Sequence, residues 1–299
     1  MRYTISFLLA SLCTSPTFAE VPAVVTDIAP VQSLVAMVMG DLGTPVLLLD
    51  RGADPHDFQL RPSQARAVAG AGLVVWIGPA MSPWLERALD GTGTAGAELA
   101  LLNAPGTRTR IFGEAGEAHV HAGAEHPGKA LDPHAWLDPR NAETWAGLIA
   151  AELVRLDPAN AATYATNADA ARAGIESLDR DIIARLVPVK DRTFVVFHDA
   201  FGYFAAHYRL SLAGAISSGD AASPGAARLR DLTATAAGTV CIFPEVNHDA
   251  DLSSQMAATS GARLGAAMDP EGTSLTPGPE LYATLMTRLA DALTGCLTP

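Results

Sequence analysis

Apolar residues in this chain form short runs, and these runs alternate with stretches in which apolar residues recur every three or four positions. The short runs are typical of buried parallel strands, and the stretches are typical of helices that pack on one face. The expected strands lie at residues 23–28, 45–49, 73–77, 193–197, 239–243 and 262–266, and the expected helices at 31–39, from 62, from 83, 200–207, from 223, 249–260 and 279–296. This alternation predicts an α/β fold.

One helical pattern is much longer than the others. Asp157-Pro158 supplies a capping residue and a first-turn proline. The apolar stripe that follows consists of Tyr164, Ala168, Ala171, Ile175, Leu178, Ile182 and Leu186. The stripe covers about seven turns, or about 40 Å. We therefore expect two α/β lobes, at residues 20–156 and 188–299, joined by one long rigid helix at residues 157–187.

Residues 103–130 contrast with the segments on either side. They are rich in glycine, alanine and polar residues, and they contain Glu114, Glu117, His119, His121, Glu125 and His126. Because no strand or helix period is visible, we expect a mobile surface loop without regular elements.

Residues 1–19 have the organisation of a secretory signal peptide. Arg2 provides a positive charge, residues 5–13 are mostly apolar, and Thr17-Phe18-Ala19 resembles a cleavage site. No later stretch reaches the roughly 18 apolar residues of a membrane helix. A lipid anchor at Cys13 is not expected, because Leu12 stands where lipoprotein processing needs a small residue. The mature protein is therefore expected to be exported and soluble.

Composition and charge narrow the function classes. The chain has 299 residues, of which 49% are hydrophobic and 17% charged, which is enough for two globular domains of about 100 to 150 residues. Loss of Arg2 with the signal peptide changes the formal net charge from −12 to −13. Such a charge argues against nucleic acid or an anionic membrane as a partner and is compatible with a cationic ligand.

Two cysteines remain in the mature chain, Cys241 and Cys296. In an oxidising compartment such a pair is most simply a disulfide. By closing a loop in the unfolded chain, it would stabilise the fold by on the order of 4 kcal/mol. Two buried free thiols are the alternative.

Three histidines stand where the chain is expected to turn. The tripeptide Asp-Pro-His ends at His56 and again at His134, and His198 follows the apolar run at residues 193–197. Each proline fixes its own φ and holds the preceding aspartate extended, and neutral imidazole is a good ligand for borderline cations such as zinc. Taken singly, each histidine could be an ordinary surface or turn residue. The repeated tripeptide favours a metal site.

Four separated blocks of sequence resemble one known family. They are residues 52–63 (GADPHDFQLRPS), 73–79 (LVVWIGP), 132–139 (DPHAWLDP) and 197–204 (FHDAFGYF). In this order they resemble the periplasmic zinc-binding proteins of high-affinity zinc uptake ABC transporters, the cluster A-I or cluster 9 solute-binding proteins. The resemblance implies two Rossmann-like lobes bridged by a rigid helix, with metal in the cleft between them. It implies capture of Zn²⁺ and delivery to an inner-membrane permease, without catalysis, by a protein expected to be a monomer.

The resemblance also implies a ligand set. His56, His134 and His198 match the family's metal histidines, and Asp269 matches the carboxylate that many relatives supply from the second lobe. Water in place of Asp269 stays open, as does an Asx turn as the role of Asp269. Manganese-binding relatives have a carboxylate where this chain has His198, so a third nitrogen favours zinc over manganese.

Further features follow from the same resemblance. His119, His121 and His126 lie where zinc-binding members carry a histidine-rich insertion, so they are candidates for an auxiliary zinc loop, and a plain linker is the alternative. Cys241 and Cys296 match a disulfide of some members. Two other functions remain as alternatives: a manganese or iron carrier of the same architecture, and a secreted zinc hydrolase. His207 and His248 are expected on the surface.

Overall fold

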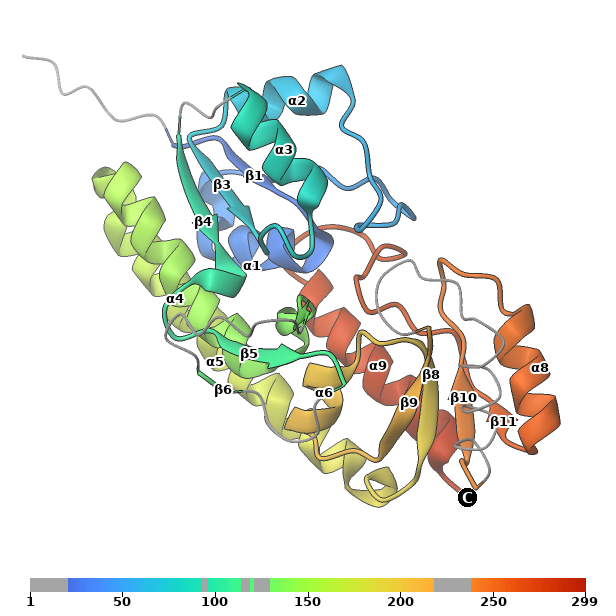
Figure 1. Cartoon of the computed structure of the whole chain (residues 1–299). Coiled ribbons are helices and arrows are strands. Elements are labelled where there is room, and N and C mark those ends of the chain that lie inside the picture. Colours follow the sequence, from blue (N-terminus) through green and yellow to red (C-terminus); the bar gives the residue numbers. More distant parts are fainter. Residues whose placement is uncertain (1–20, 93–95, 114–118, 121–129, 218–237) are drawn as a thin grey trace, which may run out of the picture.

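The computed structural model describes residues 21–92, 96–113, 119–120, 130–217 and 238–299. The expected signal peptide and the helix expected from residue 223 lie outside these ranges. Figure 1 shows two α/β lobes, with long helices running along both. Within the described ranges, no helix combines the length and the apolar content that crossing a bilayer requires. The lobe boundaries predicted above stay a prediction.

The first lobe is built on a parallel sheet in the order β2-β1-β3-β4. The strands are β1 (Val24–Thr26), β2 (Val46–Leu47), β3 (Leu73–Trp76) and β4 (Ala97–Ala100), and the helices are α1 (Ala29–Met39), α2 (Pro62–Ala69) and α3 (Pro83–Thr92). Successive side chains of a strand point to opposite faces. Leu73 and Val75 therefore join the core on the α1 side, whereas Val74 and Trp76 pack with Trp84 of α3.

The second lobe repeats this design with the sheet order β11-β10-β8-β9, again all parallel. The strands are β8 (Phe194–His198), β9 (Leu212–Ser217), β10 (Cys241–Phe243) and β11 (Arg263–Leu264), and the helices are α6 (Gly202–His207), α8 (Asp251–Ser260) and α9 (Leu281–Leu297). Val195 and Ile242 face Met256 of α8. Phe194 and Phe243 lie on the other face, in the cluster that includes α9. The predicted α/β class is confirmed.

The long helix is α5 (Ala161–Leu186), which contacts α1 of the first lobe and α9 of the second. It begins later than expected, because Pro158–Asn160 forms a 3-10 turn. Of the predicted stripe, five residues are buried and two are partly buried against the core. Beside it runs α4 (Pro139–Leu156), which our sequence analysis did not single out. The signal was present: Asp138-Pro139 caps α4 as Asp157-Pro158 was expected to cap α5.

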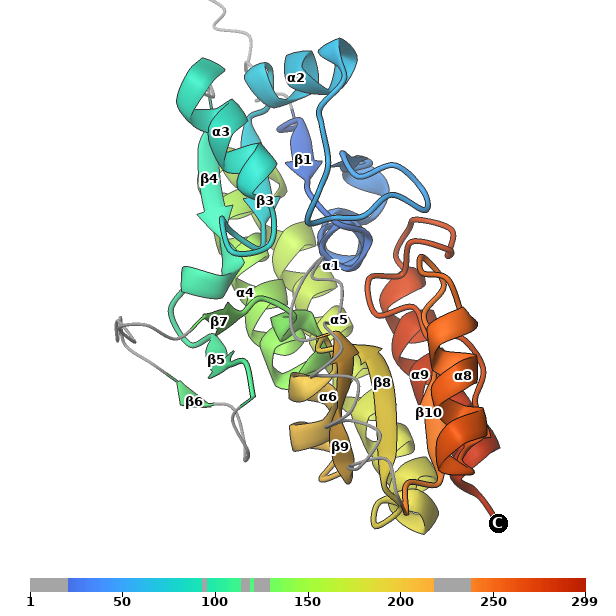
Figure 2. The same cartoon turned by 45° about the vertical axis from the view of Figure 1, so that its right-hand side comes forward.

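The expectation of no regular element in residues 103–130 is wrong in part. A small antiparallel sheet, ordered β6-β5-β7, contains β5 (Arg108–Ile111), β6 (His119–Val120) and β7 (Leu131–Asp132). Figure 2 shows it beside α4. Asn141 of α4 bonds both the N–H and the C=O of Arg108, and the hydroxyl of Tyr203 accepts the N–H of Arg110. These partners are distant in sequence, so no local pattern of apolar residues predicts β5.

The predicted disulfide between Cys241 and Cys296 is confirmed. Cys241 opens β10 and Cys296 lies in the last turn of α9, so the bond ties the sheet of the second lobe to its C-terminal helix. The two residues are separated by 55 positions. Closing a loop of this size in the unfolded chain is worth about 4 kcal/mol.

We therefore expect reduction to lower the free energy of unfolding by about 4 kcal/mol. Urea unfolding with and without dithiothreitol measures this difference. The double variant Cys241→Ala/Cys296→Ala is the control, because it should be destabilised already and should not respond to the reductant. Equal midpoints for the oxidised and reduced wild type would contradict the estimate.

Candidate metal centre

The two Asp-Pro-His tripeptides fold into the same turn. The carboxylate of Asp54 accepts the N–H of His56 at 2.8 Å, and the carboxylate of Asp132 accepts the N–H of His134 at 3.0 Å. This Asx turn is the conformation for which an aspartate followed by proline is suited. The first turn is also held by Trp84, whose indole N–H donates to the carbonyl of Pro55 at 2.8 Å. Each histidine is thus placed by its own tripeptide.

The third histidine lies at the carboxyl end of a sheet. His198 is the last residue of β8, and Glu245 follows the neighbouring parallel strand β10. Because parallel strands end at the same edge, the two side chains meet, and Nδ1 of His198 lies 2.8 Å from Oε2 of Glu245. This edge is the usual place for a ligand in an open α/β sheet.

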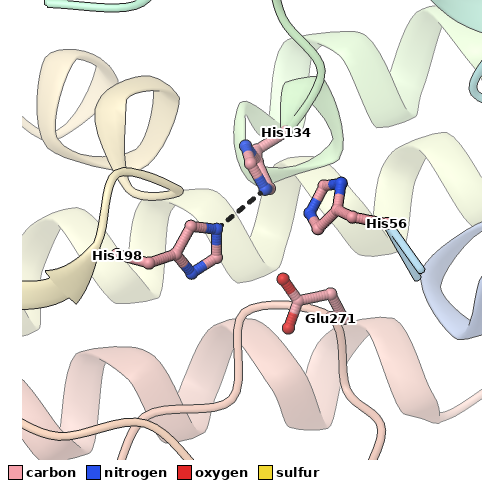
Figure 3. Close-up of side chains that lie close together, drawn as sticks. All are labelled: His56, His134, His198 and Glu271. Atoms are coloured by element: carbon pink, nitrogen blue, oxygen red, sulfur yellow. Dashed lines mark hydrogen bonds between the residues drawn. The ribbon is translucent and has the colours of Figure 1, made fainter. Parts of the chain in front are cut away.

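The three histidines converge with a carboxylate that the sequence analysis did not identify. The ligand atoms of His56, His134, His198 and Glu271 all lie within 4.8 Å of one another. Figure 3 shows the three rings and the Glu271 carboxylate directed toward a common centre. His134, His198 and Glu271 are buried, and His56 is half-buried. The arrangement offers three imidazole nitrogens and one carboxylate.

Hydrogen bonding fixes how two of the rings present their nitrogens. Nδ1 of His134 lies 2.8 Å from the Asp132 carboxylate, as Nδ1 of His198 does from Glu245. In neutral rings these contacts place the proton on Nδ1 and leave a lone pair on Nε2. The two Nε2 atoms are 3.2 Å apart. Two lone pairs at this separation repel each other unless a cation or a proton lies between them.

The carboxylates make this centre strongly attractive to a cation. Burial raises the pKa of Glu271 well above its usual value, and the nearby charge of Glu245 raises it further, while His198 acts in the opposite direction. An ionised Glu271 is therefore costly without a positive charge beside it. A divalent cation at the convergence of the rings would supply that charge.

Asp269, the carboxylate expected at this centre, lies outside the convergent group. One of its oxygens accepts the N–H of Thr273 at 2.9 Å, and the other accepts the N–H of Ser274 at 2.8 Å. Asp269 thus caps the turn that carries Glu271, which is the Asx-turn role considered above. The serine and threonine that follow are the sequence signal for this cap.

The loop that carries Glu271 is held by the first lobe. The indole N–H of Trp136, two residues after His134, donates to the carbonyl of Pro270 at 2.8 Å. The hydroxyl of Tyr282 in α9 donates back to the carbonyl of Trp136 at 2.9 Å. Both bonds are buried, so the position of Glu271 is tied to that of His134 although 137 positions separate them in the sequence.

The other predicted residues lie elsewhere. Of the auxiliary loop, His119 lies on β6, while His121 and His126 are outside the described residues. His207 was expected on the surface, but its side chain is only 8% exposed and its Nε2 lies 2.8 Å from the carboxylate of Asp179. That expectation is wrong because carboxylates from two distant segments, Asp179 of α5 and Asp138 just before α4, lie against the His207 ring. His248 is partly exposed, at 33% of its side chain.

Comparison with known proteins gives a consistent result. A family model described as "Zinc-uptake complex component A periplasmic" matches residues 24–296. The "High-affinity zinc uptake system protein ZnuA" of Paracoccus denitrificans (strain Pd 1222) is 46% identical, over 97% of each chain. The protein of the same name from Brucella suis biovar 1 is 34% identical, over 98% of this chain and 97% of its own.

The fold agrees with that of a solved relative. A structure described as "Crystal structure of ZnuA" superposes with a TM-score of 0.77 at 27% identity, covering 92% of this chain and 99% of the other. The resemblance noted from the four sequence blocks is thereby confirmed. This chain belongs to the ZnuA family of periplasmic zinc-uptake components.

Proposed function

We propose that this protein captures Zn²⁺ in the periplasm and delivers it to the membrane permease of an ABC importer. The observation that carries the proposal is the pair of Nε2 atoms of His134 and His198, 3.2 Å apart and each opposite an Nδ1 that is bonded to a carboxylate. Two nitrogens bound to tetrahedral zinc at about 2.0 to 2.1 Å are about 3.3 Å apart. The arrangement is therefore suited to zinc before any rearrangement.

The proposed ligands are His56, His134, His198 and Glu271. This set keeps the three histidines predicted from the sequence and replaces Asp269 by Glu271, because the Asp269 carboxylate is engaged in its own turn. Three nitrogens and one oxygen favour zinc over manganese, which prefers oxygen ligands. A manganese or iron carrier is therefore the less favoured alternative.

Four protein ligands also favour a carrier over a hydrolase. Catalytic zinc needs a coordination position open to water or substrate, and a fourth protein ligand fills it. Glu271 is 2% exposed and His134 is fully buried, so little space remains for a substrate beside the metal. We accordingly propose that the bound zinc is cargo, carried by a monomer to an inner-membrane permease.

The proposal predicts one tight zinc site and a large gain in stability. Ligand that binds only the folded state stabilises it by about 2.7 kcal/mol at 100 times Kd and about 4.1 kcal/mol at 1,000 times Kd. Calorimetric titration and thermal unfolding of the demetallated protein measure stoichiometry and stabilisation, with manganese as the competitor. Absence of a tight site, or tighter binding of manganese, would refute the proposal.

Zinc affinity should also fall as the pH is lowered. Free histidine binds protons at about pH 6.5, and protons compete with metal for the same nitrogens. The raised pKa of Glu271 adds to this effect, since its proton must also leave before the carboxylate can bind metal. Dissociation constants at several pH values between 8 and 5 check this. A flat profile would contradict ligation by histidine.

A further inference from the structure

Glu245 lies between two histidines, only one of which belongs to the proposed zinc site. Its Oε2 is 2.8 Å from Nδ1 of His198, and its Oε1 is 3.6 Å from Nε2 of His248. The carboxylate itself is buried, with 3% of the side chain exposed. One oxygen of Glu245 therefore contacts the proposed zinc ligand His198, and the other oxygen lies near His248, which is outside the ligand set.

His248 is held in place and reaches the solvent. Its N–H donates to the carbonyl of Glu245, and its ring stacks on Phe197 with 4.4 Å between the centroids. One third of the side chain is exposed, in contrast to the buried His134 and His198. His248 is therefore a partly exposed imidazole next to a buried carboxylate that adjoins the zinc site.

The distance between Glu245 and His248 leaves room for a shared cation. At 3.6 Å the two atoms are too far apart for a hydrogen bond, which ends near about 3.2 Å for this pair. A nitrogen and an oxygen that bind one tetrahedral zinc are about 3.3 Å apart. A small movement of the exposed ring would reach that separation, with water completing the coordination shell.

We propose that Oε1 of Glu245 and Nε2 of His248 form a second, weak zinc position through which Zn²⁺ enters and leaves the buried site. This inference rests on the proposed function, because it describes a route to that same site. The transit position, Glu245 with His248, holds zinc by two protein ligands only. The metal then passes to Glu271 and to Nε2 of His198, whose Nδ1 lies 2.8 Å from the same Glu245 carboxylate.

A transit position has a kinetic consequence that a purely structural role lacks. An intermediate position lowers the barrier in both directions, so its loss slows loading and release by the same factor and leaves the dissociation constant unchanged. A residue that only supports the ligands acts differently, because its loss raises the dissociation constant.

The test uses the full mature protein and the variant His248→Phe, which keeps an aromatic ring on Phe197 and removes the ligand atom. Stopped-flow mixing of demetallated protein with limiting zinc measures loading, and excess chelator measures release. We expect both rate constants to fall about tenfold, which corresponds to about 1.4 kcal/mol in the height of the barrier. The dissociation constant from competition should not change.

Two further variants complete the design. His248→Gln provides a second measurement if the phenylalanine variant folds poorly, and it should also slow both zinc loading and zinc release. Asp251→Asn removes an exposed negative charge from the same lobe and should load zinc at the wild-type rate. This control distinguishes a specific role of His248 from general electrostatic attraction of zinc to the lobe. Unchanged loading and release in both His248 variants would overturn the inference and favour entry past His56. A wild type without tight zinc binding would refute the proposed function itself.

Discussion

Replacing His198 by alanine is expected to weaken zinc binding by more than 100-fold. Binding of structural zinc releases about 10 to 16 kcal/mol, or about 2.5 to 4 kcal/mol for each of four ligands, and about 1.4 kcal/mol corresponds to a factor of ten. His198 is the proposed ligand at the end of strand β8 in the second lobe. Its loss also leaves the buried Glu245 without its imidazole partner. Competition with a chelator of known affinity measures the change.

His207→Gln is the matched control for this variant. His207 is also a histidine of the second lobe that contacts carboxylates, with 8% of its side chain exposed, but it lies outside the convergent group. Its replacement should lower stability and leave zinc affinity within a few-fold of the wild type. If His207→Gln weakened zinc binding as much as His198→Ala did, general destabilisation would explain both results and the assignment of His198 would fail.

The second large effect is expected at Glu271 and not at Asp269. Glu271→Ala should cost about 3 kcal/mol of zinc binding, or roughly 100-fold in affinity, because an oxygen ligand and a buried negative charge are lost together. Asp269→Asn should cost less, since it weakens the turn that carries Glu271 without removing a ligand atom. X-ray absorption of the zinc complexes distinguishes the two, because only the Glu271 variant should lose a protein oxygen from the shell.

Stability of the metal-free protein gives an independent check on Glu271. A carboxylate whose pKa is raised by folding costs stability as the pH rises above the pKa it has in the unfolded chain, and the full cost is reached above its pKa in the folded protein. Glu271→Gln removes this cost, so the demetallated variant should unfold at a higher temperature than the demetallated wild type at pH 8, while zinc should stabilise it less. If X-ray absorption instead showed that Asp269→Asn loses a protein oxygen from the zinc shell and Glu271→Ala does not, Asp269 would be the ligand.

Some features of the fold could be predicted because their causes are local. The stripe on α5 follows from helical periodicity, and the runs around Val74 and Val195 follow from burial on both faces of a parallel sheet. The antiparallel strand β5 could not be predicted from local patterns, because its hydrogen bonds to Asn141 and Tyr203 join distant parts of the chain. The low exposure of the His207 side chain could not be predicted for the same reason, since it depends on the distant Asp138 and Asp179.

The sequence alone determined which histidines belong together. The repeated Asp-Pro-His forms the same Asx turn at both of its positions in this chain, and a polar residue at the end of a buried parallel strand lies at the ligand-binding edge of the sheet. Only the tertiary structure decided which carboxylate joins them. Asp269 and Glu271 are two positions apart, and the choice depends on which of them finds N–H donors within its own turn and on where Trp136 holds the loop. Contacts between residues more than a hundred positions apart fix that geometry, and no local pattern encodes them.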